Sequence, residues 1–259
     1  MPGDFERYLH PATLSRNTHA LPGNQWYQPL LAGAETLRHF LFEVKAYEGV
    51  LHVLKSLGQD EYSKFVISLY QQGLADYGAN WRYADICTVL YALSAAIQAE
   101  SYLEIGVRRG RSMAMVAARR PQARIVGFDM WLDNYAGMEN PGPRFVVDEL
   151  RKVGFQGSLE LISGDSHKTV PEYFEQHPEA WFDLITVDGD HTELGARADL
   201  LQVIQRLKVG GVLVFDDISH PSHKYLAQVW RKTIKSRDNF LTFEFTDLGY
   251  GVAFAVRRY

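Results

Sequence analysis

From Ser101 to the C-terminus, short apolar segments alternate with longer amphipathic segments. This alternation is typical of β-α units around a parallel sheet. The predicted strands are residues 102–105, 124–128, 159–163, 182–187, 211–215, 241–245 and 251–256. The predicted helices between them are residues 112–119, 143–153, 170–177, 194–207 and 224–236.

The last two predicted strands are joined differently from the others. Only residues 246–250, which include Gly249, separate them. This connection is too short for a crossover between parallel strands, so the two strands are predicted to form an antiparallel hairpin at the sheet edge. The predicted fold class is therefore α/β, with a mostly parallel sheet that ends in a C-terminal hairpin.

The first part of the chain has a different pattern, in which apolar residues recur at helical spacing. It predicts one amphipathic helix over residues 37–54, a second over residues 65–74 and a third over residues 86–97. The sequence therefore predicts two parts: a helical extension at residues 1–98 and an α/β domain at residues 99–259.

Composition excludes several classes of protein. The 259 residues are 46% hydrophobic and 22% charged, which is ordinary for a soluble globular protein. A net charge of −4 argues against a general surface for polyanions, so no nucleic-acid partner is expected. No apolar run reaches the ~18 residues of a membrane span. The single cysteine, Cys87, cannot form an internal disulfide, and a cytoplasmic location is expected.

Ligands of open parallel sheets bind beyond the carboxyl ends of the strands, so the site is expected there. The first strand ends in a glycine-containing turn that runs from Glu104 through Gly106 and Gly110 to Ser112. Glycines permit a tight turn and close approach of a ligand to the backbone. Three residues separate the two glycines, so the turn does not match the nicotinamide-dinucleotide fingerprint. A helix start that needs flexibility is the alternative interpretation.

Carboxylates follow the next two strands. Asp129 lies 23 positions after Gly106, a separation at which an acidic residue commonly accepts hydrogen bonds from ribose hydroxyls. Asp165, followed by Ser166, comes after the third strand and could accept a hydrogen bond from an adenine amino group. Either aspartate could instead cap the following helix. Together with the glycine turn, they predict a site for an adenosine-containing molecule.

The fourth and fifth strand ends are unusually acidic. Asp188 and Asp190 follow one strand, and Asp216 and Asp217 follow the other. Carboxylates this close repel one another unless a cation or protons intervene, and oxygen ligands suit magnesium, calcium or manganese. Helix capping and solvated surface charge are the alternative. His191 is a candidate general base or an exposed histidine at a helix start.

Taken together, these motifs resemble those of the class I methyltransferases that use S-adenosylmethionine, and the resemblance covers residues 101–259. It implies a Rossmann-like sheet with a C-terminal hairpin. It also implies that the cofactor is held by the strand-end residues Glu104, Gly106, Gly110, Ser112, Asp129, Asp165 and Ser166. Asp129 would bind the ribose, and Asp165 the adenine.

Within that class, the acidic motifs are similar to those of metal-dependent sugar O-methyltransferases of macrolide and aminocoumarin biosynthesis and of cephalosporin-cluster methyltransferases. This similarity implies that Asp188, Asp216 and Asp217 bind magnesium, with His191 as the catalytic base and Asp188 also in a catalytic role. In some relatives a glutamate replaces Asp216. The helical extension would shape the pocket of a small-molecule acceptor and form the contacts of a homo-oligomer, expected to be a dimer.

The sequence leaves three other functions open. A metal-independent methyltransferase acting on oxygen or nitrogen would retain activity after chelation of metals. A protein that binds S-adenosylmethionine without methyl transfer would bind the cofactor and not turn over. A nicotinamide dehydrogenase is disfavoured by the glycine spacing.

A few residues outside the strand ends have two interpretations each. His220 and His223 could lie beside the metal or occupy ordinary loop positions. The aromatic residues of the first part could line an acceptor pocket or pack in the core; they are Trp26, Tyr27, Trp81 and Tyr83.

Overall fold

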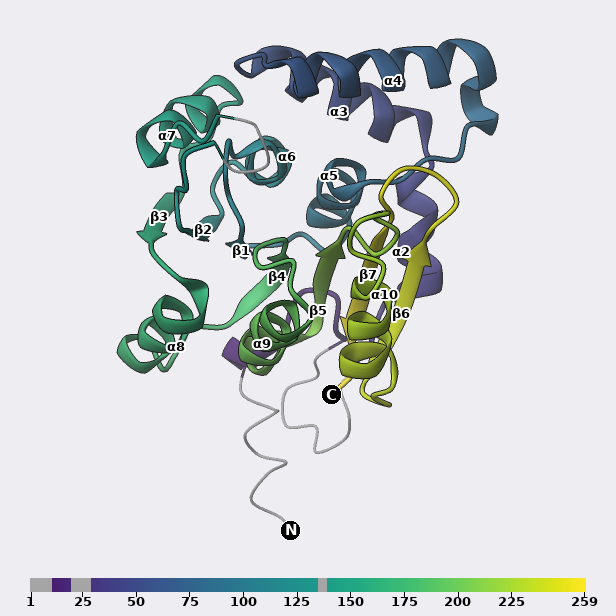
Figure 1. Ribbon diagram of the computed structural model, residues 1–259. Coiled ribbons are helices and arrows are strands. Elements are labelled where there is room, and N and C mark those ends of the chain that lie inside the picture. The colour runs from purple at the N-terminus through teal and green to yellow at the C-terminus, as the bar shows by residue number, and fades with distance from the viewer. Residues whose placement is uncertain (1–10, 20–28, 135–138) are drawn as a thin grey trace.

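The computed structural model describes residues 11–19, 29–134 and 139–259. Its centre is a seven-stranded sheet of order β3-β2-β1-β4-β5-β7-β6 (Figure 1). The first five strands pair in parallel, and β7 pairs antiparallel with both β5 and β6. The strands are β1 (Ser101–Ile105), β2 (Arg124–Asp129), β3 (Ser158–Ser163), β4 (Phe182–Val187), β5 (Leu207–Asp216), β6 (Phe240–Phe245) and β7 (Val252–Arg257).

All seven predicted strands are confirmed, including the C-terminal hairpin of β6 and β7. The start of β5 differs from the prediction, because the strand begins at Leu207 and not at Gly211. Leu207 pairs with Phe182, and the register shifts before Leu184. Gly210 adopts a φ of +78° within this stretch. Gly210 and Gly211 therefore make the strand irregular without ending it.

Helices cover both faces of the sheet (Figure 1). One face carries α5, α6 and α7, and the other carries α8, α9 and α10. Their bounds are α5 (Ile86–Ala96), α6 (Arg111–Arg119), α7 (Pro143–Lys152), α8 (Ser166–Gln176), α9 (Glu193–Val203) and α10 (Leu226–Trp230), with a 3-10 turn at Ile204–Arg206 and a π-helical turn, η5, at Arg231–Lys235. The predicted single helix over residues 224–236 is therefore an α-helix that widens into a π-turn.

The helix predicted over residues 37–54 is wrong as one element. The chain forms α2 (Ala34–Leu41) and α3 (Val44–Ser56), and Glu43 between them is extended. Phe42 packs on Phe245 of β6, with ring centroids 5.9 Å apart. This contact anchors the break between the helices. The next helix, α4 (Glu61–Tyr77), is longer than predicted, because it is capped by Asp60, whose side chain accepts from the Ser63 amide.

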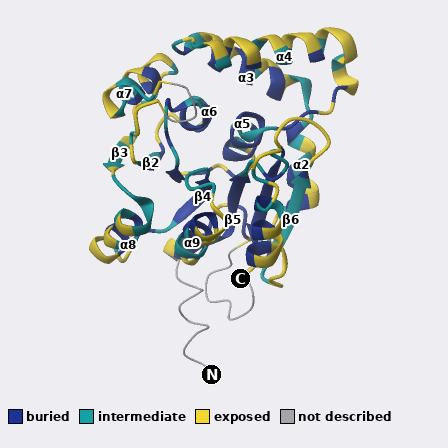
Figure 2. Cartoon of the chain, in the orientation of Figure 1, coloured by how far each residue is buried: buried dark blue, intermediate teal, exposed yellow. Residues whose placement is uncertain are grey.

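Two apolar cores lie on the two faces of the sheet (Figure 2). The side chains of β5 alternate between them: Val212 and Val214 join the core with α5, whereas Leu213 and Phe215 join the core with α9. The buried faces of α2, α3 and α5 share the first core with α6. The division of the chain at residues 98 and 99 stays a prediction.

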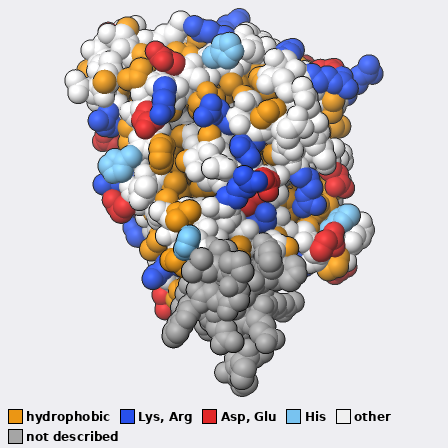
Figure 3. Space-filling view, turned by 180° about the vertical axis from the view of Figure 1, so that it is seen from behind, with side chains coloured by type: hydrophobic (Ala, Val, Ile, Leu, Met, Phe, Trp, Pro, Cys, Tyr) orange, Lys and Arg blue, Asp and Glu red, His pale blue; other side chains and the backbone are white. Residues whose placement is uncertain are grey.

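The molecular surface carries both signs of charge. On the side opposite to that of Figure 1, basic and acidic side chains are interspersed among polar and apolar ones (Figure 3). Among the described residues, none of the helices is both long and apolar enough to cross a membrane.

Candidate active site

The glycine turn after β1 brings the ends of β1 and β4 into direct contact. Gly106 has a φ of +94°, and a Cβ built on it would lie 1.9 Å from the backbone oxygen of Asp188. A side chain at this position would therefore separate the two strand ends. Gly110 also has a positive φ, +71°, and is the N-cap of α6. The backbone conformation of the turn predicted to hold the cofactor therefore favours glycine at both positions.

Glu104 is fully buried beneath this turn. Its carboxylate accepts hydrogen bonds from the hydroxyl of Tyr102, at 2.9 Å, and from the hydroxyl of Ser112. Burial raises the pKa of Glu104 to about 8 despite both hydrogen bonds, and the charges of Asp188 and Asp129 add to the rise. Glu104 and Ser112, both predicted to bind cofactor, therefore bind each other in this structure.

Asp129 connects the β2 end to the glycine turn. One carboxylate oxygen accepts from the backbone amide of Arg108 at 2.7 Å, and the other accepts from the amide of Trp131 at 2.6 Å. These bonds place the carboxylate at the edge where the cofactor is predicted. Each carboxylate oxygen has more than one lone pair, so this arrangement leaves acceptor capacity for ribose hydroxyls.

Asp165 is the N-cap of α8. Helix capping was the alternative to cofactor binding that the sequence left open for this residue. Its carboxylate accepts from the amide of His167 at 3.0 Å. The hydroxyl of Ser166 donates to Asp199 of α9 at 2.7 Å, and burial raises the pKa of Asp199 to about 6. Ser166 therefore joins α8 to α9. The predicted roles of Asp165 and Ser166 toward the cofactor remain predictions.

The acidic residues after β4 and β5 come together around a histidine. His191 Nε2 lies 3.2 Å from Asp188 Oδ1 and 3.7 Å from Asp217 Oδ2. One ligand atom from each of these three residues lies within 4.8 Å of the other two. The three side chains are partly buried, with 27%, 20% and 16% of Asp188, His191 and Asp217 exposed. This group is the candidate active site.

Backbone conformation directs Asp216, the last residue of β5, and Asp217, the residue after it, differently. Asp217 has a φ of +62°, in the left-handed region that costs energy for a residue with a side chain. Its carboxylate faces Asp188 and His191. Asp216 continues the alternation of Val212 and Val214, so it belongs to the face that carries α5. Asp216 is outside the 4.8 Å group, and its predicted role as a ligand stays a prediction.

Burial and electrostatic repulsion both shift the pKa values of the acidic residues and of His191. Burial, together with the nearby charge of Asp188, raises the pKa of Asp217 to about 7, although His191 opposes the rise. Burial and the charges of Asp188 and Asp217 also raise the pKa of Asp216 well above its ordinary value. Burial alone would lower the pKa of His191, but the hydrogen bond and negative charge of Asp188 outweigh it, so this pKa is raised.

The loop after β5 adds one residue, Tyr225, that the sequence did not identify, beside the two predicted histidines. Tyr225 donates a hydrogen bond from its hydroxyl to the backbone oxygen of His191 at 2.5 Å, and His223 Nδ1 lies 3.1 Å from that hydroxyl. The rings of His191 and His223 have centroids 5.2 Å apart, and those of His223 and His220 are 4.8 Å apart. Both loop histidines therefore lie beside the candidate active site. Nothing in the local sequence distinguishes Tyr225.

The aromatic residues of the first part pack mainly on one another. Trp81 and Tyr83 are buried and stacked, with ring centroids 5.2 Å apart and planes 9° apart. Tyr47 and Tyr70 complete the cluster. Core packing is thus the interpretation that the geometry supports for Trp81 and Tyr83. Trp26 and Tyr27 lie outside the described residues.

Part of the chain matches a known protein family. Residues 103–218 match the family Methyltransf_24, described as a methyltransferase domain. The matched segment of this domain runs from β1 past Asp217, so it includes the glycine turn and the acidic group.

Several solved structures have the same fold and superpose on most of the chain. TomG, an O-methyltransferase from Streptomyces achromogenes in complex with SAM, superposes with a TM-score of 0.54 at 19% identity, covering 78% of this chain and 92% of its own. An O-methyltransferase from Bacillus cereus in complex with SAH gives a TM-score of 0.54 at 16% identity, covering 77% and 92%.

A third similar structure is CalS11, a calicheamicin methyltransferase that is also described as a TDP-rhamnose 3'-O-methyltransferase. It superposes with a TM-score of 0.51 at 20% identity, covering 85% of this chain and 96% of its own. No curated protein sequence is significantly similar to the chain. The prediction of a class I methyltransferase is confirmed by the family match and the fold.

Proposed function

We propose that this protein is an S-adenosylmethionine-dependent O-methyltransferase that acts on a small hydroxylated acceptor and requires a divalent cation. The observation that carries the proposal is the convergence of Asp188, His191 and Asp217 within 4.8 Å, at strand ends next to the glycine turn. The similar structures add support, because they include O-methyltransferases in complex with SAM or SAH and a TDP-rhamnose 3'-O-methyltransferase.

The residues present fit a hard divalent cation. Asp188 and Asp217 offer carboxylate oxygens, the donors that magnesium and manganese prefer. Repulsion from Asp188 contributes to the raised pKa values of Asp216 and Asp217, and a cation would relieve this repulsion. We therefore assign the cation to Asp188 and Asp217, with Asp216 as the third carboxylate. When bound, the cation supplies Lewis-acid activation and orientation of neighbouring acceptor hydroxyls.

His191 is proposed as the general base of the reaction. Its Nε2 lies 3.2 Å from Asp188 Oδ1, and the raised pKa of the imidazole favours acceptance of a proton. The acceptor hydroxyl gives its proton to His191, and its oxygen attacks the methyl carbon of the sulfonium. The new oxygen–carbon bond forms as the carbon–sulfur bond breaks, which leaves S-adenosylhomocysteine and imidazolium. Asp188 stabilises that positive charge.

The remaining strand ends are proposed to hold the cofactor. The absence of a side chain at Gly106 lets the ends of β1 and β4 contact each other directly beside the proposed cofactor site. Asp129 would accept hydrogen bonds from the ribose and Asp165 from the adenine. Glu104 and Ser112 support the turn from below, with Gly110 starting α6. Ser166 would position the start of α8 through Asp199.

The acceptor is proposed to be a small molecule with adjacent hydroxyls, such as a sugar of a natural product or a catechol. Two neighbouring hydroxyls can engage one cation together, which would fix the direction of the attacking oxygen. The half-exposed loop with His220 and His223 borders the acidic group and would contact such an acceptor. We further propose a cytoplasmic homodimer in which the helices before β1 form the subunit contacts.

The experiment that tests this function measures methyl transfer from labelled S-adenosylmethionine to a panel of nucleotide sugars and catechols. Turnover is expected with Mg²⁺ and is expected to be lost after chelation. Asp217→Asn should reduce turnover about 100-fold or more, as for loss of a major electrostatic element. The matched control is Asp190→Asn, because Asp190 lies in the same loop, where its carboxylate accepts from the Thr192 amide at 2.7 Å, a bond that asparagine retains.

Each alternative function has its own outcome in this experiment. Full turnover in chelated protein would identify a metal-independent methyltransferase. Tight binding of S-adenosylhomocysteine without turnover on any acceptor would identify a binding protein that lacks catalysis. Either result would overturn the proposal.

A further inference from the structure

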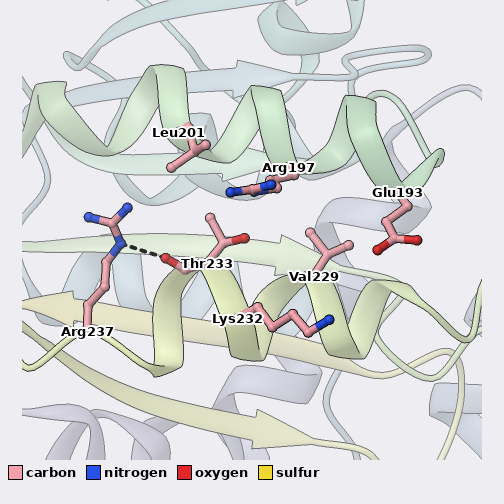
Figure 4. Close-up of a pocket in the computed structure, with 7 residues that line it drawn as sticks. All are labelled: Glu193, Arg197, Leu201, Val229, Lys232, Thr233 and Arg237. Atoms are coloured by element: carbon pink, nitrogen blue, oxygen red, sulfur yellow. Dashed lines mark hydrogen bonds between the residues drawn. The ribbon is translucent and has the colours of Figure 1, made fainter.

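A cavity lies on the face of the sheet that carries α8, α9 and α10, between two neighbouring helices (Figure 4). It has a volume of about 230 Å³ and separates α9 from the continuous helix formed by α10 and η5. Its lining residues are Glu193, Arg197, Leu201, Val229, Lys232, Thr233 and Arg237. None of them belongs to the proposed catalytic or cofactor site.

Three of the lining residues are cationic and come from both walls. Arg197 projects from α9, Lys232 from η5, and Arg237 from the residues just after it (Figure 4). Among the described residues, no ion pair or side-chain hydrogen bond is found for Arg197 or Lys232. Arg237 donates to the backbone oxygen of Thr233 at 2.7 Å, which holds its side chain along the cavity.

The cations on the other side of the same π-turn behave differently. Arg231 and Lys235 both pair with Glu244 of β6, at 2.8 Å and 3.0 Å. Four of the cations of this region thus divide into a pair neutralised by a carboxylate and a pair, Arg197 and Lys232, without one. The unneutralised pair is the one that faces the cavity.

An unpartnered hydroxyl lies between the walls. Thr233 is 4% exposed, and its Oγ1 has no hydrogen-bond partner. Figure 4 shows this side chain directed from η5 toward α9. A buried hydroxyl without a partner is costly, and polar groups of this kind are commonly satisfied by a ligand or water. A π-turn, the conformation that presents Thr233 here, is itself frequent at functional sites.

The one carboxylate of the cavity lies at its far end. Glu193 is in the first turn of α9, where the helix dipole favours negative charge, and Figure 4 places it at the end opposite to Arg237. Arg197 and Thr233 lie between these two ends, and the Lys232 side chain extends along η5 toward the Glu193 end (Figure 4). Repulsion by Glu193 would keep an anion toward Arg197 and Thr233.

We propose that this cavity is a binding site for a small oxyanion of the phosphate or phosphate-ester class. Arg197 and Lys232 would contact the anion from opposite walls, and the Thr233 hydroxyl would donate to it. Guanidinium and ammonium groups form their strongest hydrogen bonds to such charged acceptors. The volume, below the ~300 Å³ at which sites for drug-sized ligands begin, suits a phosphate group with little attached to it.

The test is a calorimetric titration of the full chain with pyrophosphate at low ionic strength and without divalent cations. Saturable binding of one pyrophosphate per chain is expected. The double variant Arg197→Ala/Lys232→Ala should weaken it at least about tenfold, as expected for loss of charge-assisted hydrogen bonds. The matched control is Arg231→Ala/Lys235→Ala, which removes the same two residue types from the same helical region and should change the affinity less than threefold.

A second variant separates the ligand role of Thr233 from a structural one. Thr233→Val keeps the shape of the side chain and removes the hydroxyl. Because that hydroxyl has no partner in the free protein, this variant should have an equal or higher melting temperature and yet bind pyrophosphate several-fold more weakly. A structural role would lower the melting temperature instead.

Three results would overturn the proposal. They are no saturable binding to the unmodified chain, equal weakening by the two double variants, and a lowered melting temperature of Thr233→Val with unchanged affinity. Equal weakening would mean that pyrophosphate responds only to the general positive charge of the surface. None of these results bears on methyl transfer, so the proposed function is tested separately.

Discussion

The hydroxyl of Tyr225 donates a hydrogen bond of 2.5 Å to the backbone oxygen of His191. This bond links the loop after β5, which begins at Asp217, to the loop after β4, which carries Asp188. The two halves of the candidate active site are thus joined by one side chain that contributes no ligand atom to the acidic group. Its position explains how two separate loops maintain a separation of 3.7 Å between His191 and Asp217.

Tyr225→Phe is expected to lower turnover about fivefold, because loss of one hydrogen bond of about 1 kcal/mol loosens the base relative to the acidic group. The affinity for S-adenosylhomocysteine should stay within about twofold, since Tyr225 is outside the proposed cofactor residues. Steady-state kinetics and calorimetry measure the two quantities. Tyr250→Phe is the control, because Tyr250 packs its ring on His220 and its hydroxyl makes no hydrogen bond to any other described residue. Equal activity of both variants would contradict this role.

Gly106→Ala is expected to destabilise the protein by more than about 3 kcal/mol and to abolish binding of S-adenosylhomocysteine. The added Cβ would lie 1.9 Å from the backbone oxygen of Asp188, so the ends of β1 and β4 must separate. Gly154→Ala is a matched control, because Gly154 also has a positive φ, +81°, but open space around its Cα. The control should cost only the left-handed backbone strain of about 1–2 kcal/mol. Denaturant unfolding distinguishes the two, and equal losses would contradict the steric argument.

Glu104 should make the stability of the free protein depend on pH. Its pKa is about 8 in the folded chain, against an ordinary value of 4.5, so the folded state retains a proton that the unfolded state has lost between these values. The free energy of unfolding should therefore fall as pH rises from about 5 to 8, by at most about 1.4 kcal/mol per pH unit from this group. Above its folded pKa the contribution levels off.

Glu104→Gln tests that dependence, because glutamine is neutral at every pH. Urea unfolding at pH 5.5 and pH 8 should show a smaller loss of stability in the variant than in the unmodified chain. Parallel loss in both proteins would mean that Glu104 does not hold a proton when folded.

Asp60 joins the helical part of the chain to the glycine turn. Its carboxylate lies 3.2 Å from Arg109 Nε and 3.3 Å from Arg111 Nη1, and only 6% of the Arg109 side chain is exposed. Asp60→Ala should lower the free energy of unfolding by about 2–4 kcal/mol, since it removes a helix cap and leaves a buried guanidinium without this partner. Glu61→Ala, at the next residue, removes only an exposed ion pair with Lys64 and should cost less than about 1 kcal/mol. Thermal unfolding of both variants makes the comparison.

Much of the fold follows from local patterns in the sequence. The apolar runs identified all seven strands, and the short connection through Gly249 identified the hairpin. The break between α2 and α3 was not predictable, because it depends on packing of Phe42 against β6, 200 residues away in the chain. The early start of β5 likewise depends on pairing of Leu207 with Phe182, a tertiary contact that periodicity does not contain.

The candidate active site shows the same division. Residue types and strand ends placed Asp188, His191 and Asp217 together, because carboxyl ends of adjacent parallel strands meet at one edge. The sequence did not reveal the positive φ of Asp217, which makes its side chain point in a different direction from that of Asp216. Tyr225 had no signal either, since its contact with His191 crosses between two loops.

The central claim is that the acidic group binds a divalent cation, and titration with Mn²⁺ followed by electron paramagnetic resonance tests it most directly. The account predicts one Mn²⁺ per chain, with affinity at least about tenfold lower in Asp217→Asn and in Asp188→Asn and unchanged in Asp190→Asn. Absence of bound Mn²⁺ in the unmodified chain, or equal affinity in all four proteins, would contradict it.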